Sequence, residues 1–136
     1  MDTEPIHALA WENAIRDLAG SDAQNRPAHL PDLAAFVAAS SGRSDPEVAK
    51  EAGRRYELDP KRALRVKRHT FLTLLQSHLV PSASVRGAVE RIAERCRVSV
   101  VSASAESEVR ETLRLAALDD LFDIVISHES TRNSKP

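Results

Sequence analysis

The sequence predicts an α/β fold in which a long helical part precedes a short parallel sheet. Residues 5–80 carry apolar side chains at helical spacing, and two short β-branched runs follow at 98–101 and 124–126. Glycine is scarce, with 4 residues, and aromatic residues make up 4% of the chain, which disfavours an all-β fold with glycine turns. The chain is 42% apolar and 29% charged, a composition that favours a folded protein over a disordered one.

Four helices are expected in the first part of the chain. They cover residues 5–19, with Gly20 as the stop, then 31–39, a segment from 45, and a long segment from 60 to about 79. Proline stands at the start of the first, third and fourth helices, where its missing N–H costs nothing. Residues 21–28 are polar and are expected to connect the first two helices.

The pattern changes after Val80-Pro81-Ser82-Ala83, which we interpret as a domain boundary. Beyond it, helices are expected over 85–95 and 106–118, with strands over 98–101 and 124–126. Two short apolar strands joined by a helix predict a right-handed βαβ unit in a parallel sheet.

Charge and cysteine content exclude several classes of protein. Nineteen basic residues nearly balance 20 acidic ones, so the net charge of −1 gives no field that would recruit nucleic acid. The lone Cys96 excludes an internal disulfide framework and suits a reducing compartment. The acidic start of the chain is no signal peptide, and no apolar run approaches the roughly 18 residues of a membrane span. A cytoplasmic protein without membrane contact is therefore expected.

The residues that carry chemistry are expected at the strand ends, because ligands of open α/β sheets bind outside the carboxyl ends of the strands. Ser102 ends the first strand, and a helix follows at once. A hydroxyl beside the free N–H groups of a helix start predicts a phosphate site. The alternative is that Ser102 and Ser104 only cap the helix. Lys135 follows the second strand and either returns to the same edge as a positive charge or stays solvated in the tail.

Three stretches of residues 85–136 resemble the haloacid dehalogenase-like hydrolases, in the branch that includes beta-phosphoglucomutase and phosphoglycolate-type phosphatases. These stretches are Val100-Val101-Ser102-Ala103-Ser104, Leu121-Phe122-Asp123-Ile124-Val125-Ile126 and Ser134-Lys135-Pro136. Residues 2–11 resemble the same branch, in which this stretch directly follows the D-x-D-G-x-x motif.

The resemblance implies a fold, a domain organisation and a set of site residues. Residues 81–136 would form part of a Rossmann-like phosphate-binding core, 15–80 a helical cap domain, and 1–14 the hinge and first cap helix. Phosphate would be bound by Ser102, Ala103 and Lys135, and the substrate and hinge residues would be Asp2, Thr3, His7, Ser104 and Arg43.

The resemblance also implies an activity, and it identifies catalytic and metal-binding carboxylates that this sequence does not contain. The resemblance implies that the full-length protein is a Mg²⁺-dependent phosphatase or phosphomutase. Such an enzyme would act on a phosphorylated small metabolite through an aspartyl-phosphate. Its nucleophilic aspartate would precede Met1, and the carboxylates that complete its Mg²⁺ site would follow Pro136. The chain is thus expected to be truncated at both ends, to bind no Mg²⁺ and to be inactive alone.

Two non-catalytic alternatives stay open. The basic residues between 50 and 68, which include Lys67 and Arg68, are compatible with a helical nucleic-acid-binding segment, although nearby acidic residues dilute their charge. The other alternative is a pseudoenzyme that a partner chain completes. Because a two-strand sheet leaves an exposed edge, we also expect self-association through that edge.

Overall fold

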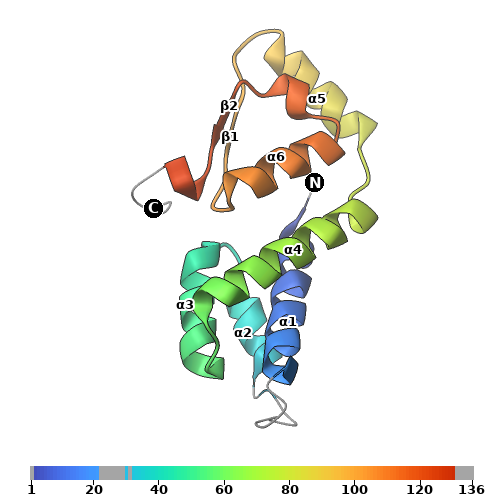
Figure 1. The fold of residues 1–136 in the computed structure, drawn as a ribbon. Helices are drawn as coiled ribbons and strands as arrows, with labels where there is room; N and C mark the ends of the chain where they lie inside the picture. Colours follow the sequence, from blue (N-terminus) through green and yellow to red (C-terminus); the bar gives the residue numbers. More distant parts are fainter. Residues whose placement is uncertain (1, 22–29, 31, 131–136) are drawn as a thin grey trace. The chain divides into compact units, whose positions relative to one another are not determined.

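The computed structural model describes residues 2–21, 30 and 32–130, and the chain divides into two compact units. The helical unit comprises Asp2–Leu74 and the α/β unit begins at Leu75, so the boundary falls within helix α4 (Figure 1). Over the described residues, no helix is both long and apolar enough to cross a membrane. The elements in chain order are α1 (Glu4–Ser21), α2 (Leu33–Ala39), α3 (Asp45–Tyr56), α4 (Pro60–His78), α5 (Ala83–Ala93), β1 (Ser99–Val101), α6 (Glu106–Leu115), η1 (Asp119–Leu121), β2 (Ile124–Ile126) and η2 (His128–Ser130).

The helical unit is organised around α1, which packs against α2 and α3. Trp11, Ile15 and Leu18 recur at the i, i+4 and i+7 spacing of one helix face, and all three are buried. The other three helices complete this core with Leu33, Phe36, Val48, Ala49, Ala52 and Ala63. The helical pattern predicted for the first part of the sequence is therefore confirmed over the described residues.

The start of α3 is stabilised by its own first turn. Ser44 is the N-cap residue, and its N–H and its hydroxyl both donate to the Glu47 carboxylate, at 3.2 and 2.7 Å. These two hydrogen bonds fix Ser44, which precedes the helix, to Glu47, the third residue of the helix. Asp45, the first residue of the helix, takes no part in this cap, and its side chain is buried.

The turn from α3 to α4 approaches α3 closely at Gly53. A Cβ atom at this position would lie 2.7 Å from Cγ of Pro60 and 2.8 Å from the carbonyl oxygen of Leu58. Gly53→Ala is therefore expected to lower the free energy of unfolding by about 1–3 kcal/mol through overpacking, although alanine is the better helix former. Urea denaturation followed by circular dichroism measures the change.

The matched control for this substitution is Gly20→Ala near the end of α1, where a Cβ atom would meet nothing within 4 Å. This control is expected to be neutral or slightly stabilising, because only the helix propensity changes. Equal effects of the two substitutions would show that the close contacts at Gly53 do not exclude a Cβ atom there.

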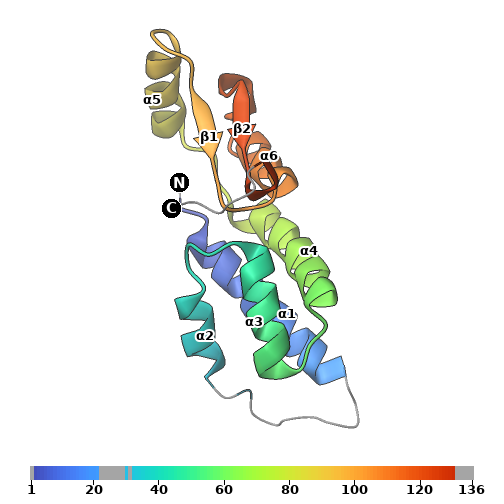
Figure 2. The same cartoon turned by 90° about the vertical axis from the view of Figure 1, so that its left-hand side faces the viewer.

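The α/β unit contains the predicted parallel pair of strands. β1 lies beside β2 with Ser99 opposite Ile124, Val100 opposite Val125 and Val101 opposite Ile126, and α6 connects the two strands. Figure 1 shows α5 and α6 on the same side of the strands, and Figure 2 looks onto the other face. The core between the strands and the helices consists of Val109, Leu113, Ala116 and Leu118, with Leu79, Val85, Val100, Leu121, Phe122 and Val125 packed against it.

The connection after α6 differs from the prediction. The helix ends at Leu115 rather than at residue 118, because Ala117 adopts a left-handed conformation with φ of 55°. Arg86 of α5 holds this corner by donating to the Ala117 carbonyl and, at 2.7 and 2.8 Å, to both carboxylate oxygens of Asp120. The prediction that Gly20 stops α1 is also wrong by one residue, since α1 continues to Ser21.

Candidate functional site

The carboxyl end of β1 leads directly into the predicted phosphate-binding loop. Ser102 continues the strand ladder, because its N–H donates to the carbonyl oxygen of Ile126 at 2.9 Å. Its hydroxyl oxygen accepts the N–H of Ser104 at 3.1 Å, which turns the chain toward α6. A serine hydroxyl has one proton and two lone pairs, so accepting this bond leaves the proton of Ser102 for donation to an acceptor.

The start of α6 already holds a negative charge. The backbone N–H of Glu106, the first residue of the helix, donates to Oε2 of Glu129 at 3.1 Å. Glu129 belongs to η2, the single turn that follows β2. Carboxylates are stabilised at this position by the partial positive charge of a helix N-terminus. This end of the sheet therefore favours anions.

The residues after β2 are held by hydrogen bonds among themselves. Ser127, with 1% of its surface exposed, donates its N–H to the Ser130 hydroxyl at 3.2 Å and accepts the Glu129 N–H at 3.2 Å. These bonds place the Glu129 carboxylate against α6. The predicted ligand Lys135 lies outside the described residues, as do its neighbours Ser134 and Pro136.

A second polar cluster lies in the helical unit. Nζ of Lys67 lies 2.5 Å from Oδ2 of Asp45 and 3.0 Å from Nδ1 of His7. Nε1 of Trp11 donates to the other Asp45 oxygen at 3.0 Å, so both carboxylate oxygens are bonded. The Lys67 side chain has no exposed surface and that of Asp45 is 7% exposed. The His7 ring stacks on Phe71 with centroids 4.1 Å apart.

The cluster determines the protonation state of His7. An ammonium group only donates, so Nδ1 of His7 accepts from Lys67 and the ring proton resides on Nε2. Burial and, next, the Lys67 charge lower the pKa of His7 to about 4, although the Asp45 charge opposes them. His7 is therefore neutral at pH 7, with a defined tautomer.

The other predicted hinge and substrate residues have separate local roles. Oδ1 of Asp2 accepts the N–H of Glu4 at 3.0 Å at the start of α1, and the Thr3 carbonyl oxygen accepts the N–H of His7 at 3.0 Å. Arg43, in the loop before α3, binds the Glu51 carboxylate at 2.8 Å. The Arg43 charge is thus engaged within the helical unit.

Sequence reasoning missed Lys67 and Asp45. Lys67 was counted among the exposed basic residues of the possible nucleic-acid-binding segment, and the structure corrects this by burying it. The available signal was its spacing, because it lies four residues after Ala63 and four before Phe71, both of which are buried. A lysine in the apolar stripe of a helix indicates a buried partner.

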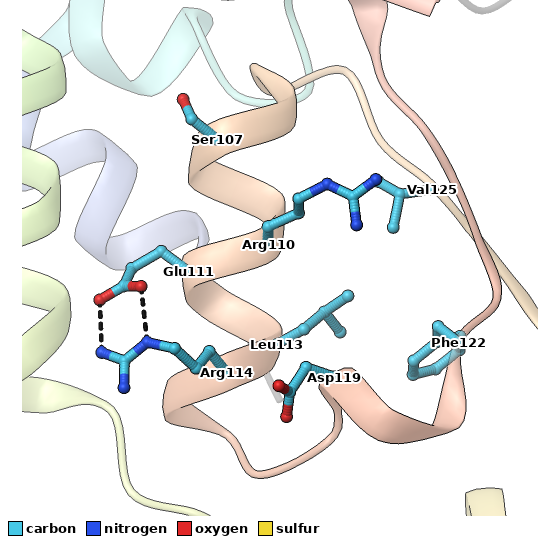
Figure 3. Close-up of a pocket in the computed structure, with 8 residues that line it drawn as sticks. All are labelled: Ser107, Arg110, Glu111, Leu113, Arg114, Asp119, Phe122 and Val125. Carbon is cyan, nitrogen blue, oxygen red and sulfur yellow. Dashed lines mark hydrogen bonds and ion pairs between the residues drawn. The ribbon is translucent and has the colours of Figure 1, made fainter.

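A shallow groove of about 370 Å³ runs along α6 in the α/β unit (Figure 3). Its floor is apolar, with Leu113, Phe122 and Val125. Its two arginines already have carboxylate partners, since Arg114 binds Glu111 at 2.7 Å and Arg110 binds Glu106 at 2.6 Å. Because both guanidinium groups are neutralised, this groove is a weaker candidate for an anion site than the strand ends. The residues lining it are Ser107, Arg110, Glu111, Leu113, Arg114, Asp119, Phe122 and Val125.

Magnesium prefers oxygen ligands, with carboxylates foremost. Taken separately and over their described residues, neither unit gathers three His, Cys, Asp or Glu ligand atoms in one place. At the carboxyl ends of the strands, the Glu129 carboxylate is bonded to the start of α6. Within either unit alone, the described residues therefore do not form a magnesium site.

Comparison with known proteins gave one family. The family model described as haloacid dehalogenase-like hydrolase matches residues 34–136, which is more than half of the chain. A search of curated proteins gave no match. The matched range includes both strands and the loop that follows β1.

Proposed function

Because this chain belongs to the family of haloacid dehalogenase-like hydrolases, we propose that the carboxyl end of β1 binds the phosphoryl group of a phosphorylated small metabolite. The single observation that carries the proposal is Ser102, which ends a parallel strand and keeps a hydroxyl proton for an acceptor beside the start of α6. The start of α6 attracts negative groups, as the bond from the Glu106 N–H to the Glu129 carboxylate illustrates, and a phosphoryl group would compete with that carboxylate there.

The binding roles follow from the donors available in the loop. The Ser102 hydroxyl donates to one phosphoryl oxygen, and the backbone N–H of Ala103 donates to a second. Lys135 contributes a positive charge that offsets the charge of the phosphoryl group. All three groups bind and orient the phosphoryl group, and none of them acts as a nucleophile.

The reaction proposed for the complete protein is phosphatase or phosphomutase chemistry, in the branch that includes beta-phosphoglucomutase. An aspartate oxygen attacks phosphorus, the bond to the substrate oxygen breaks, and the resulting aspartyl-phosphate passes its phosphoryl group to water or to a sugar hydroxyl. Magnesium in the complete protein would offset the charge of the transferring group. We assign it no ligand in this chain, which we propose is inactive alone.

The helical unit is proposed to act as the cap that covers the substrate. Asp2, Thr3 and His7 lie at the start of α1, close in sequence to the hinge, and Arg43 lies in the loop before α3. The buried Lys67 and Asp45 are proposed to position His7 rather than to contact substrate.

Inorganic phosphate tests the binding proposal through thermal stability. A ligand present at about ten times its dissociation constant stabilises the folded state by about 1.4 kcal/mol, which for a unit of this size is a rise in Tm of several degrees. We expect this rise in the wild-type chain and in Ser102→Thr, which keeps the hydroxyl, but not in Ser102→Ala.

The matched control is Ser99→Ala, which removes an exposed hydroxyl from the opposite end of β1. This variant is expected to keep the full stabilisation by phosphate. Phosphate also stabilises proteins without binding a site, because it is excluded from their surfaces. An equal rise in Tm for the wild type and Ser102→Ala would therefore contradict the proposed site.

A further inference from the structure

The Glu129 carboxylate is an anion of the chain itself that lies at the start of α6. Its Oε2 atom accepts the backbone N–H of Glu106 at 3.1 Å, and the contact is exposed to solvent. The first N–H groups of a helix have no partner within the helix, and they carry its partial positive charge. Glu129 therefore occupies the kind of donor that the oxygens of a phosphoryl group also bind.

The contact lies at the edge of the proposed phosphoryl site. The ends of β1 and β2 are joined there, because the Ser102 N–H donates to the carbonyl oxygen of Ile126 at 2.9 Å. From this edge, the chain reaches Glu106 four residues after Ser102 and reaches Glu129 three residues after Ile126. A negatively charged phosphoryl group on Ser102 and the Glu129 carboxylate would therefore repel one another.

The charge of Glu129 is not neutralised within the described part of the chain. Its carboxylate forms no ion pair with a described lysine, arginine or histidine, and its bond is to a backbone N–H. The carboxylate of Glu106 differs in this respect, because it binds Arg110 of the same helix at 2.6 Å. Glu129 is thus a carboxylate beside the start of α6 whose full charge acts on an incoming anion.

The Glu129 side chain can leave α6 while the turn that carries it stays intact. The Glu129 backbone is held separately, because its N–H donates to the hydroxyl of the buried Ser127 at 3.2 Å. The Ser127 carbonyl oxygen accepts the Ser130 N–H at 3.0 Å, which closes η2. Rotation about the side-chain bonds of Glu129 therefore frees the Glu106 N–H and turns the carboxylate into water.

We propose that Glu129 makes an autoinhibitory contact, in which its carboxylate occupies the start of α6 and is displaced when a phosphoryl group binds at the carboxyl end of β1. We build here on the phosphoryl site proposed above and assign it an internal competitor. The closed state has Glu129 bonded to the Glu106 N–H, and the open state leaves that N–H for the ligand. The apparent affinity for phosphate falls by the fraction of the chain that is open, so removing the competitor raises it.

Titration of the full ¹⁵N-labelled chain with inorganic phosphate at constant ionic strength, followed by NMR, tests this contact. Glu129→Gln keeps the size of the side chain and an acceptor oxygen but removes the charge. Phosphate is expected to bind this variant at least about threefold more tightly than the wild type. The matched control is Glu94→Gln, which removes an exposed carboxylate from the end of α5, ahead of the amino end of β1, and is expected to bind like the wild type.

A second readout needs no variant. In the wild-type chain, the ¹³C resonance of the Glu129 carboxyl group is expected to move on saturation with phosphate, because the carboxylate leaves the Glu106 N–H, whereas that of Glu94 stays unchanged. An unmoved Glu129 resonance, or equal phosphate affinities of wild type and Glu129→Gln, would overturn the autoinhibitory contact while the binding itself upheld the phosphoryl site. Absence of phosphate binding in both chains would overturn the site and the contact together.

Discussion

Replacing Lys67 with methionine is expected to lower the free energy of unfolding by roughly 3–5 kcal/mol, the usual cost of removing one partner of a buried ion pair. Methionine keeps most of the volume of the lysine stem, so the loss reports the charge rather than a cavity. It leaves the Asp45 carboxylate, of which 7% is exposed, without its cation, and it removes the donor to His7. Urea denaturation of the full chain measures the effect.

Two controls separate the buried pair from ordinary surface charge. Arg16→Met breaks the exposed pair with Glu12 in α1 and is expected to cost far less, because solvent screens that pair. Asp45→Asn added to Lys67→Met is expected to cost little more than Lys67→Met alone, since the second substitution removes a charge that has already lost its partner. If Lys67→Met lowered the free energy of unfolding by less than about 1 kcal/mol, Lys67 and Asp45 would not form a buried ion pair.

Acidification is expected to destabilise the helical unit through His7. The folded pKa of about 4 lies below the ordinary value of 6.5, so the unfolded chain binds the proton first as the pH falls. The stability associated with the neutral ring is fully present above pH 6.5 and is lost as the pH falls toward 4. This shift corresponds to about 3 kcal/mol of unfolding free energy across that window.

The pH dependence is assigned by substitution. His7→Gln removes the titrating group, so the difference in unfolding free energy between wild type and variant is expected to change across pH 4 to 6.5. His69→Gln, which replaces an exposed histidine of α4, is the matched control and is expected to keep the wild-type profile. If His7→Gln and wild type showed parallel profiles, the ring would not be held neutral by burial.

Most secondary structure could be predicted because it depends on local patterns. The proline-led starts of α3 and α4 and the β-branched runs of β1 and β2 are short-range signals, and each lies where the sequence placed it. The end of α6 was missed because Ala117 gives no sign in the sequence of its left-handed backbone. That conformation is supported by Arg86, which lies 31 residues earlier and donates to the Ala117 carbonyl.

Residues of the candidate site could be predicted only where the elements that form the site adjoin in the sequence. Ser102 was identifiable because the end of a strand and the start of a helix adjoin in the sequence. The cluster of Lys67, Asp45 and Trp11 was not identified, since its members come from three helices and meet only through tertiary packing. The Glu129 contact with Glu106 was missed for the same reason, as 23 residues separate the two.

Binding of a phosphoryl group at the carboxyl end of β1 is the central prediction for this protein. A titration of ¹⁵N-labelled chain with inorganic phosphate, followed by two-dimensional NMR, locates the binding site residue by residue. We predict saturable shifts of the backbone amides of residues 102–104 in the wild type and their loss in Ser102→Ala. Saturable shifts confined to other residues, or shifts at 102–104 that Ser102→Ala leaves unchanged, would contradict this prediction.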